Sequence, residues 1–530
     1  MGSNPISSTI SLILSAASLH YNPAFPLSFR TWGIRMRLTA TFRVVLAAAA
    51  TVAACVSTAA QDARDASIAA RVDQVFAEFA KPGSPGCALG VYRDGRTIYA
   101  KGYGLANLEE NVSITPQAVF DIGSTSKQFS AAGILLLEKA GKLSVNDDVR
   151  KYVPELPDYS KEYGRPVTIL NLLNHTSGLR DYLTLFALAG INTDSVTTDD
   201  DALTMITRQK KLNFAPGSDY LYSNSGYFLL SVIVKRVSGK SLRDFAQENI
   251  FAPLGMTHTQ YRDKHTALIP NRALAYDARE GGSYALDVSY FEQTGDGAVH
   301  TTVEDLQKWD ENFYSAQIGG RDFLAEIQER GTLTGGKTIS YAKGLSIGEY
   351  RGLHVVSHGG SWGGYRAQLM RFPQQHFSVA CLCNVDTSDT TRLAHGVADV
   401  YLAAQMRPAE AAPAEAPEKK PPEPLKLSAA DLAAFAGDYA SDELLVTYRL
   451  AVKDAKLVLA GIVDADGRLR TDLLAPRDLL ATAADEFTTA RGHNVLHFRR
   501  DASGKVTGFV LDAGRTLGMA FVRVPASGRP

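Results

Sequence analysis

Cysteine is scarce in this 530-residue sequence, which contains four. That number is too small for a disulfide framework, and no C-x-x-C pair or histidine cluster has the spacing of a zinc site. Cys381 and Cys383 alternate on one face of an apparent strand, and Cys87 lies in another apolar run. We therefore expect buried, unreactive thiols, with no metal and no cofactor.

Excess charge is also absent, because the formal net charge is -1. A balanced chain lacks the basic surface that nucleic acid requires, so nucleic acid is not an expected partner. Internal repeats and glycine-rich phosphate loops are missing as well. The length and a hydrophobic content of 45% suffice for one large domain and a smaller one, each with a packed core. Oligomeric state leaves no signal in the sequence.

The N-terminal region has one short apolar run, residues 44–54, and it is too short to span a bilayer. It follows Met36 and two arginines and is followed by small residues, which is the pattern of a secretory signal. We expect Met36 to be the true start, residues 1–35 to be an upstream extension and residues 36–60 to be a leader.

Two forms of that leader fit the sequence. Val52 to Cys55 resembles a bacterial lipoprotein box, in which Cys55 would carry a lipid anchor. Cleavage after Ala60 is the alternative. Either form predicts an exported protein that is periplasmic, held at the membrane as a lipoprotein, or secreted. The third interpretation is that the segment stays uncleaved and serves as a membrane anchor.

Ser124 and Lys127 are the residues around which the sequence is best interpreted. They stand three positions apart where an extended segment, from Phe120, gives way to the apolar run 129–137. On the first turn of a helix the two side chains would share one face, placing a nucleophile beside a base. The alternative is structural, with Ser124 as a helix N-cap and Lys127 in solvent.

Further motifs follow in order along the chain. Tyr222 and Asn224 lie on a loop that enters an apolar helix, and the structural alternative is a core aromatic and an N-cap. A later strand carries His358 and then becomes rich in glycine around Gly360. Glycine weakens a strand unless something must approach its backbone closely, and a ligand is the expected occupant.

The expected fold class is α/β in the α+β sense: an antiparallel sheet flanked by helices, with a mostly helical subdomain. A helix over 68–79 precedes a hairpin at Asp94 and Gly95, and a second hairpin is expected from residue 367 to residue 385. This domain should occupy residues 66–405. A Pro/Ala/Glu-rich linker at 406–426 then leads to a small β-barrel-like domain at 427–526.

The ordered motifs Ser124-x-x-Lys127, Tyr222-x-Asn224 and His358-x-Gly360 resemble those of the serine β-lactamase and penicillin-binding-protein superfamily. The spacing is most similar to the class C β-lactamase, esterase and D-aminopeptidase branch. The C-terminal segment resembles the lipocalin-like domain appended to some of these peptidases. The resemblance implies a serine hydrolase that cleaves a small peptide, amide or ester through an acyl-enzyme, without metal or cofactor.

The same resemblance implies a role for each motif residue. Ser124 would be the nucleophile, Lys127 its base and Tyr222 the group that relays a proton to the leaving group. Asn224 and His358 would contact the substrate. The backbone N–H groups of Ser124 and of Ser361, the residue after Gly360, would form the oxyanion hole.

The third motif departs from the β-lactamase pattern, in which a lysine occupies the position of His358. A histidine lacks that permanent positive charge, so the departure favours peptide or ester hydrolysis over β-lactam hydrolysis. If the substrate is anionic, its affinity should weaken as pH rises through the histidine titration. A β-lactamase or cell-wall D,D-peptidase is the alternative enzyme, and a non-catalytic sensor that traps its ligand covalently is the alternative of another class.

Overall fold

The computed structural model describes residues 65–192, 194–408, 424–489 and 494–525. The predicted leader, with Cys55, and most of the predicted linker lie outside the described residues. Within the described residues, no helix combines the length and the apolar character needed to cross a bilayer.

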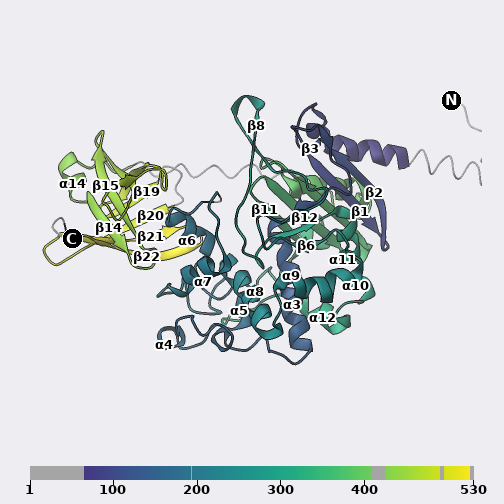
Figure 1. Ribbon diagram of the computed structural model, residues 1–530, viewed down its shortest axis with the longest axis horizontal. Coiled ribbons are helices and arrows are strands. Elements are labelled where there is room, and N and C mark those ends of the chain that lie inside the picture. Colours follow the sequence, from purple (N-terminus) through teal and green to yellow (C-terminus); the bar gives the residue numbers. More distant parts are fainter. Residues whose placement is uncertain (1–64, 193, 409–423, 490–493, 526–530) are drawn as a thin grey trace, which may run out of the picture. The chain divides into compact units, whose positions relative to one another are not determined.

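An antiparallel six-stranded sheet forms the centre of the first domain, with the strand order β10-β11-β12-β13-β1-β2 (Figure 1). Its strands are β1 (Cys87–Arg93), β2 (Arg96–Tyr103), β10 (Ser346–Tyr350), β11 (Leu353–Trp362), β12 (Tyr365–Phe372) and β13 (Phe377–Cys383). Both predicted hairpins are confirmed, since β1 pairs with β2 and β12 pairs with β13.

Alternation along the strands gives this sheet two buried faces. On β1, Leu89 and Val91 pack with the helical segment 65–75 and with α13 (Thr390–Leu402). Ala88 and Tyr92 point the other way into the larger core, and the Tyr92 hydroxyl donates to a carbonyl of α11 (Val303–Ser315). The predicted sheet flanked by helices is therefore confirmed.

The mostly helical part of the domain surrounds α3 (Lys127–Lys139), which is buried along most of its length. The other helices are α4 (Ser160–Tyr163), α5 (Ile169–Leu173), α6 (Tyr182–Leu188), α7 (Asp199–Thr207), α8 (Asn224–Ser238), α9 (Leu242–Ala246), α10 (Ala252–Leu254) and α12 (Gly320–Ile327). Short strands β5 (Phe120–Asp121), β9 (Val299–Thr301) and β6 (Gln260–Tyr261) form a small sheet that leads into α3. Two small hairpins complete the domain, β3 (Leu105–Asn107) with β4 (Val112–Ser113) and β7 (Tyr276–Ala278) with β8 (Tyr284–Leu286).

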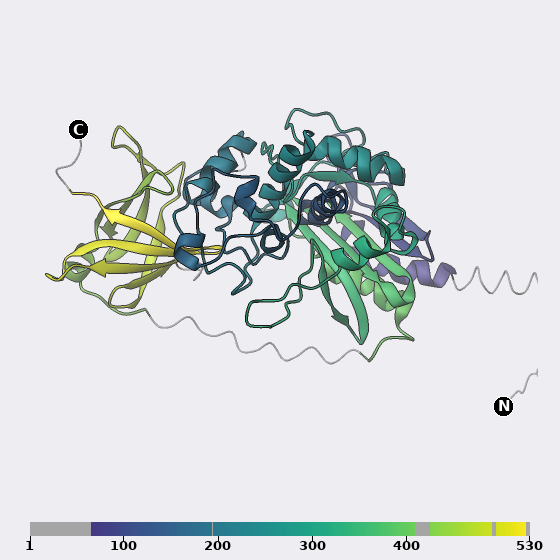
Figure 2. The same ribbon diagram turned by 90° about the horizontal axis from the view of Figure 1, so that it is seen from below.

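The C-terminal domain is a closed eight-stranded antiparallel barrel, which confirms the predicted β-barrel-like fold and adds its closure and strand number. The strands run β15-β14-β22-β21-β20-β19-β18-β16, and a β15–β16 pairing closes the ring. They are β14 (Gly437–Ser441), β15 (Val446–Lys453), β16 (Lys456–Val463), β18 (Arg477–Ala483), β19 (Glu486–Thr489), β20 (Asn494–Arg500), β21 (Val506–Ala513) and β22 (Thr516–Arg523). A short β17 (Leu469–Arg470) adds to β16, and α14 (Ala429–Ala433) precedes the barrel. The β21–β22 hairpin is drawn in yellow in Figure 2.

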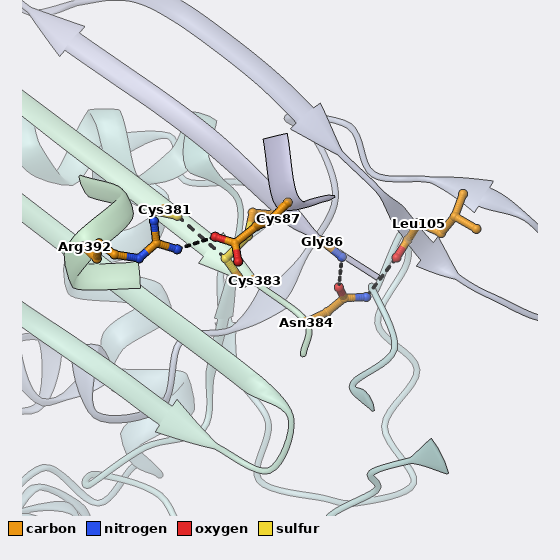
Figure 3. Close-up of a disulfide and its surroundings, with 8 residues drawn as sticks. Gly86, Cys87, Leu105, Cys381, Cys383, Asn384 and Arg392 are labelled. Carbon is orange, nitrogen blue, oxygen red and sulfur yellow. Dashed lines mark hydrogen bonds and ion pairs between the residues drawn. A yellow bond between two sulfur atoms is a disulfide. The ribbon is translucent and has the colours of Figure 1, made fainter. Parts of the chain in front are cut away.

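A disulfide joins two neighbouring strands of the central sheet (Figure 3). Cys87 on β1 and Cys383 on β13 lie directly opposite each other in the register and are bonded. The expectation of unreactive thiols is therefore wrong for this pair, because the fold brings together strands that are 296 residues apart in sequence. Cys381 remains a free buried thiol, with its Sγ 3.7 Å from that of Cys383, and burial raises its pKa.

The end of β13 is fixed beside this disulfide by an asparagine. The side chain of Asn384 accepts a hydrogen bond from the Gly86 backbone N–H at 2.8 Å and donates one to the Leu105 carbonyl at 3.0 Å (Figure 3). The disulfide and the hydrogen bonds of Asn384 together hold the start of β1 against β13. No local sequence pattern predicts these contacts.

Candidate active site

Ser124 lies on a single 3-10 turn, Gly123–Ser126, between β5 and α3. The turn begins with Gly123 in the left-handed region (φ +48°), and the Asp121 carboxylate accepts its N–H at 2.8 Å. A Cβ atom at Gly123 would lie 2.7 Å from the backbone nitrogen of Ser361. Glycine is therefore required both by the turn and by the close approach of β11 to the candidate nucleophile.

Lys127 begins α3 one turn after Ser124, and the predicted pair is formed. Its Nζ lies 3.1 Å from Ser124 Oγ, 2.9 Å from Asn224 Oδ1 and 2.5 Å from the backbone oxygen of Asp296. An ammonium group has three protons and can satisfy all three acceptors. Once one proton is lost, the nitrogen can instead accept the proton of the Ser124 hydroxyl.

The surroundings of Lys127 favour that loss. The side chain is fully buried, and desolvation lowers its pKa from the usual 10.5 to about 8. The negative charge of Asp296 acts in the opposite direction and limits the decrease. A lysine with this pKa is partly neutral near physiological pH, which a serine base must be.

Tyr222 lies beside the same pair. Lys127 Nζ is 4.9 Å from the centroid of its ring. Its hydroxyl is buried without a hydrogen bond of good geometry to any described residue, yet it is near enough to Ser124 for that side chain to lower its pKa. Burial has the larger effect and raises the pKa, so the phenol keeps its proton and can donate it.

Asn224 is the first residue of α8 and not its N-cap, which is Ser223. The Asn224 backbone N–H donates to Asp181 Oδ2 at 2.6 Å. Its side-chain oxygen accepts from Lys127, while the residue also lines the cavity in front of Ser124. The structural alternative of an N-cap is therefore wrong, and Asn224 connects the lysine to the start of a buried helix.

His358 is held as a neutral side chain by its neighbours. Its Nε2 lies 2.9 Å from the Tyr341 hydroxyl, and its Nδ1 lies 2.6 Å from the Gly359 carbonyl. These contacts assign the proton to Nδ1 and leave Nε2 to accept from the tyrosine. Burial and the charge of Lys127 lower the His358 pKa to about 4. The expectation of a histidine that titrates between pH 5 and 8 is therefore wrong, because His358 is neutral across that range.

The glycines near His358 serve the protein's own packing. A Cβ atom at Gly360 would lie 1.9 Å from the Ile122 carbonyl oxygen. The close approach predicted at this strand is therefore made at Gly360 by the segment that precedes Ser124, and not by a ligand alone. It brings the backbone of Ser361 to the same edge of the cavity as the backbone of Ser124.

A cavity of about 720 Å³ unites these groups. Ser124 lines it together with five other residues singled out in the sequence: Tyr222, Asn224, His358, Gly360 and Ser361. Lys127 lies buried behind them. The structure thus brings all seven predicted site residues together.

Three polar residues of the site were not among the candidates chosen from the sequence: Asp296, Tyr341 and Arg515. The backbone oxygen of Asp296 contacts Lys127, and its side chain accepts a hydrogen bond from the Tyr182 hydroxyl at 3.1 Å. Tyr341 fixes His358 from a loop between α12 and β10. Arg515 lines the cavity from the barrel, on the turn between β21 and β22.

Comparison with known proteins agrees with this geometry. A family model described as Beta-lactamase matches residues 72–404. The chain belongs to that family. Penicillin-binding protein 4* of Bacillus subtilis is 30% identical over 312 residues, which cover 55% of this chain and 66% of that protein. The D-aminopeptidase of Brucella anthropi is 28% identical over 309 residues, covering 57% of this chain and 56% of that protein. The chain thus spans less than two thirds of the length of either relative.

A solved structure is similar in fold over most of the chain. The octameric penicillin-binding protein homologue from Pyrococcus abyssi is 23% identical, with a TM-score of 0.57, and the match covers 86% of this chain and 99% of that one.

Proposed function

We propose that this beta-lactamase family protein is a serine hydrolase that cleaves a small peptide, amide or ester through an acyl-enzyme. The contact of Lys127 Nζ with Ser124 Oγ carries the proposal, because it places a partly neutral amine within reach of a hydroxyl that faces the cavity. The curated relatives named as a penicillin-binding protein and a D-aminopeptidase support it.

The first half of the reaction follows from these positions. Ser124 Oγ attacks the substrate carbonyl carbon while its proton passes to Lys127 Nζ. The backbone N–H groups of Ser124 and Ser361 stabilise the oxyanion. Tyr222 gives its proton to the departing nitrogen or oxygen and recovers one from Lys127. The bond to the leaving group breaks, and the acyl group stays on Ser124.

The second half returns the enzyme to its starting state. A water molecule loses a proton to the neutral Lys127 amine and attacks the acyl carbon. The bond to Ser124 Oγ breaks, and the serine regains its proton as the carboxylic acid leaves. Asn224 holds the lysine in position throughout and faces the acyl side of the substrate. His358, neutral and bound to Tyr341, shapes the wall of the cavity without supplying charge.

Labelling by a fluorophosphonate probe tests the proposal. We expect one covalent adduct per chain, mapped by peptide mass to the segment that contains Ser124, and no adduct on the Ser124→Ala variant. A Ser130→Ala variant is the matched control, since Ser130 lies on α3, directly after the turn that carries Ser124, but is fully buried and hydrogen-bonded to Tyr261 and Gly295. Labelling that persists on Ser124→Ala would show that the nucleophile is another residue.

The acyl-enzyme also separates hydrolysis from the sensor function. Intact mass measured during turnover of a small ester should show an adduct that clears when the substrate is exhausted. An adduct that never clears would favour a protein that traps its ligand. Turnover of a chromogenic cephalosporin as fast as that of an ester would instead favour the β-lactamase alternative.

The pH dependence should follow Lys127 and not His358. The reactive form needs a neutral amine, so kcat/KM for a neutral ester should rise with pH and level off above about 8, the pKa of Lys127. Asp296→Asn removes a charge that raises this pKa, and the rising limb should therefore move to lower pH. His358→Gln should leave the limb in place. A limb that follows His358 would contradict the assignment of the base.

We also propose that the chain is exported. The sequence before residue 61 supports this through its secretory pattern. The Cys87–Cys383 disulfide supports it independently, because such bonds form and persist mainly in oxidising compartments.

A further inference from the structure

The β21–β22 hairpin of the barrel carries an arginine at the edge of the catalytic cavity. Its two-residue turn is Gly514 and Arg515, with Gly514 in the left-handed region (φ +53°). Arg515 lines the cavity beside Tyr222 and Asn224, although nearly 300 residues separate it from them in sequence. The side chain is 44% exposed, so it is open to an occupant of the cavity.

The hairpin is fixed in this position by hydrogen bonds to its backbone. The side chain of Asn213 donates to the Arg515 carbonyl at 3.0 Å and accepts from the Leu517 N–H at 2.8 Å. Arg180 donates to the carbonyls of Leu517 and Gly518 at 3.0 and 2.9 Å. These hydrogen bonds fix the backbone around the turn without involving the Arg515 side chain, which lines the cavity.

The guanidinium group of Arg515 is poorly satisfied by the described residues. Its nearest ionic contact is a long one, 3.9 Å from Asp181 Oδ2, and that oxygen already accepts the Asn224 N–H at 2.6 Å. Its remaining contact is with the face of the Tyr222 ring, 4.6 Å from the centroid. Both interactions orient the group without using up its five hydrogen-bond donors.

The two other arginines that line the cavity differ in this respect. Arg262 donates to the carbonyls of His265 and Ser289, and Arg366 donates to those of Gly363 and Tyr365. Those guanidinium groups serve the structure of their loops. Among the arginines lining the described cavity, Arg515 is therefore the one whose donors are directed to no backbone carbonyl.

The position of Tyr222 defines which part of a substrate Arg515 would meet. In the proposed reaction Tyr222 gives its proton to the leaving group, so a group that contacts the Tyr222 ring and lines the same cavity lies near the leaving group. A guanidinium binds a carboxylate through two parallel hydrogen bonds, a geometry that a neutral ester or amide cannot match. His358 cannot substitute, because it is neutral and bonded to Tyr341.

We propose that Arg515, supplied by the barrel, binds a carboxylate on the leaving group and so determines substrate specificity. This inference rests on the proposed serine hydrolase function. It makes the barrel a part of the active site, and it predicts as favoured substrates small peptides or depsipeptides whose departing residue carries a free carboxylate.

Two thioesters with one acyl group test the proposal. The N-benzoylglycyl thioester of mercaptoacetate has an anionic leaving group, and that of methyl mercaptoacetate has a neutral one. The measured quantity is the ratio of kcat/KM for the anionic ester to that for the neutral ester. Comparing this ratio between variants cancels the intrinsic reactivity of the two esters and any change in the Lys127 pKa.

We expect Arg515→Gln to lower the ratio by about tenfold or more, since a charge-assisted pair is lost. Arg515→Lys should retain part of the ratio, because the charge remains without the planar fork. Arg499→Gln is the matched control: it removes another exposed barrel arginine, one that does not line the cavity, and its ratio should equal that of the wild type. Added salt should lower the wild-type ratio.

The outcomes distinguish the two proposals. If both esters are hydrolysed and Ser124→Ala abolishes this, but Arg515→Gln and salt leave the ratio unchanged, the hydrolase proposal stands and the role of Arg515 is wrong. If the wild type hydrolyses neither ester, the hydrolase proposal fails and the role of Arg515 fails with it. Thermal melting curves of each variant show whether a lower anionic-to-neutral kcat/KM ratio results from a destabilised fold.

Discussion

Replacing Lys127 with methionine should lower kcat/KM for a neutral ester by about 10²- to 10⁴-fold, the contribution of a positioned general base. Methionine keeps most of the volume of the buried side chain but cannot take the proton of Ser124. The loss should appear mainly in kcat, because Lys127 lies behind the cavity wall and does not contact the substrate in the proposed reaction.

Lys308→Met is the matched control for this experiment. Lys308 is a partly buried lysine on α11 that donates to Asp305 Oδ1 at 2.8 Å and does not line the described cavity. Its variant should keep the wild-type rate. Activity of Lys127→Met within about tenfold of the wild type would exclude Lys127 as the main base. Thermal unfolding of both variants reports on the fold separately.

The catalytic pair could be predicted because its geometry is local. A spacing of three positions on one helical turn brings Ser124 and Lys127 together independently of the rest of the fold. The apolar run after them indicates a buried helix. The hairpins and several barrel strands were predictable for the same reason, since alternation and turn residues act over a few positions.

The remaining features depend on contacts between distant segments. Asp296 sets the charge near Lys127 from a loop 169 residues away, and Tyr341 fixes the tautomer of His358. The disulfide requires β1 and β13 to be neighbours in the sheet. Arg515 reaches the cavity because a second domain packs against the first. Predicting each of these contacts requires the tertiary structure, because hydrophobic periodicity and motif spacing describe only neighbouring residues.

His358 shows how a motif can mislead when its environment is unknown. In solution a histidine titrates near pH 6.5, and the sequence therefore predicted a pH-sensitive substrate contact. Burial next to Lys127 lowers its pKa to about 4, which removes the charge that the prediction required. Arg515, which lines the same cavity, is the cation that we propose for substrate binding instead.

Replacing Arg180 with methionine should lower the free energy of unfolding by about 3–5 kcal/mol, measured by urea denaturation. Arg180 forms an ion pair with Glu443 of the barrel at 2.8 Å, and the two side chains are only 1% and 8% exposed. Its loss would leave the Glu443 carboxylate buried without its cation, as well as the two hairpin carbonyls that Arg180 binds. Removing the partner of a buried charge costs more free energy of unfolding than removing the partner of an exposed charge.

Arg500→Met is the control, because Arg500 pairs with Asp485 at 2.8 Å on the barrel surface with both side chains at least one third exposed. Its cost should be below about 1 kcal/mol. The double variant Arg180→Met with Glu443→Leu should lose less free energy of unfolding than the sum of the losses of its two single variants, because no charge is then left unpaired. Equal costs for Arg180→Met and Arg500→Met would show that this pair does not hold the hairpin. If it does, Arg180→Met should also lower the anionic-to-neutral ester ratio, because the same contacts that stabilise the barrel against the catalytic domain position Arg515 over Tyr222.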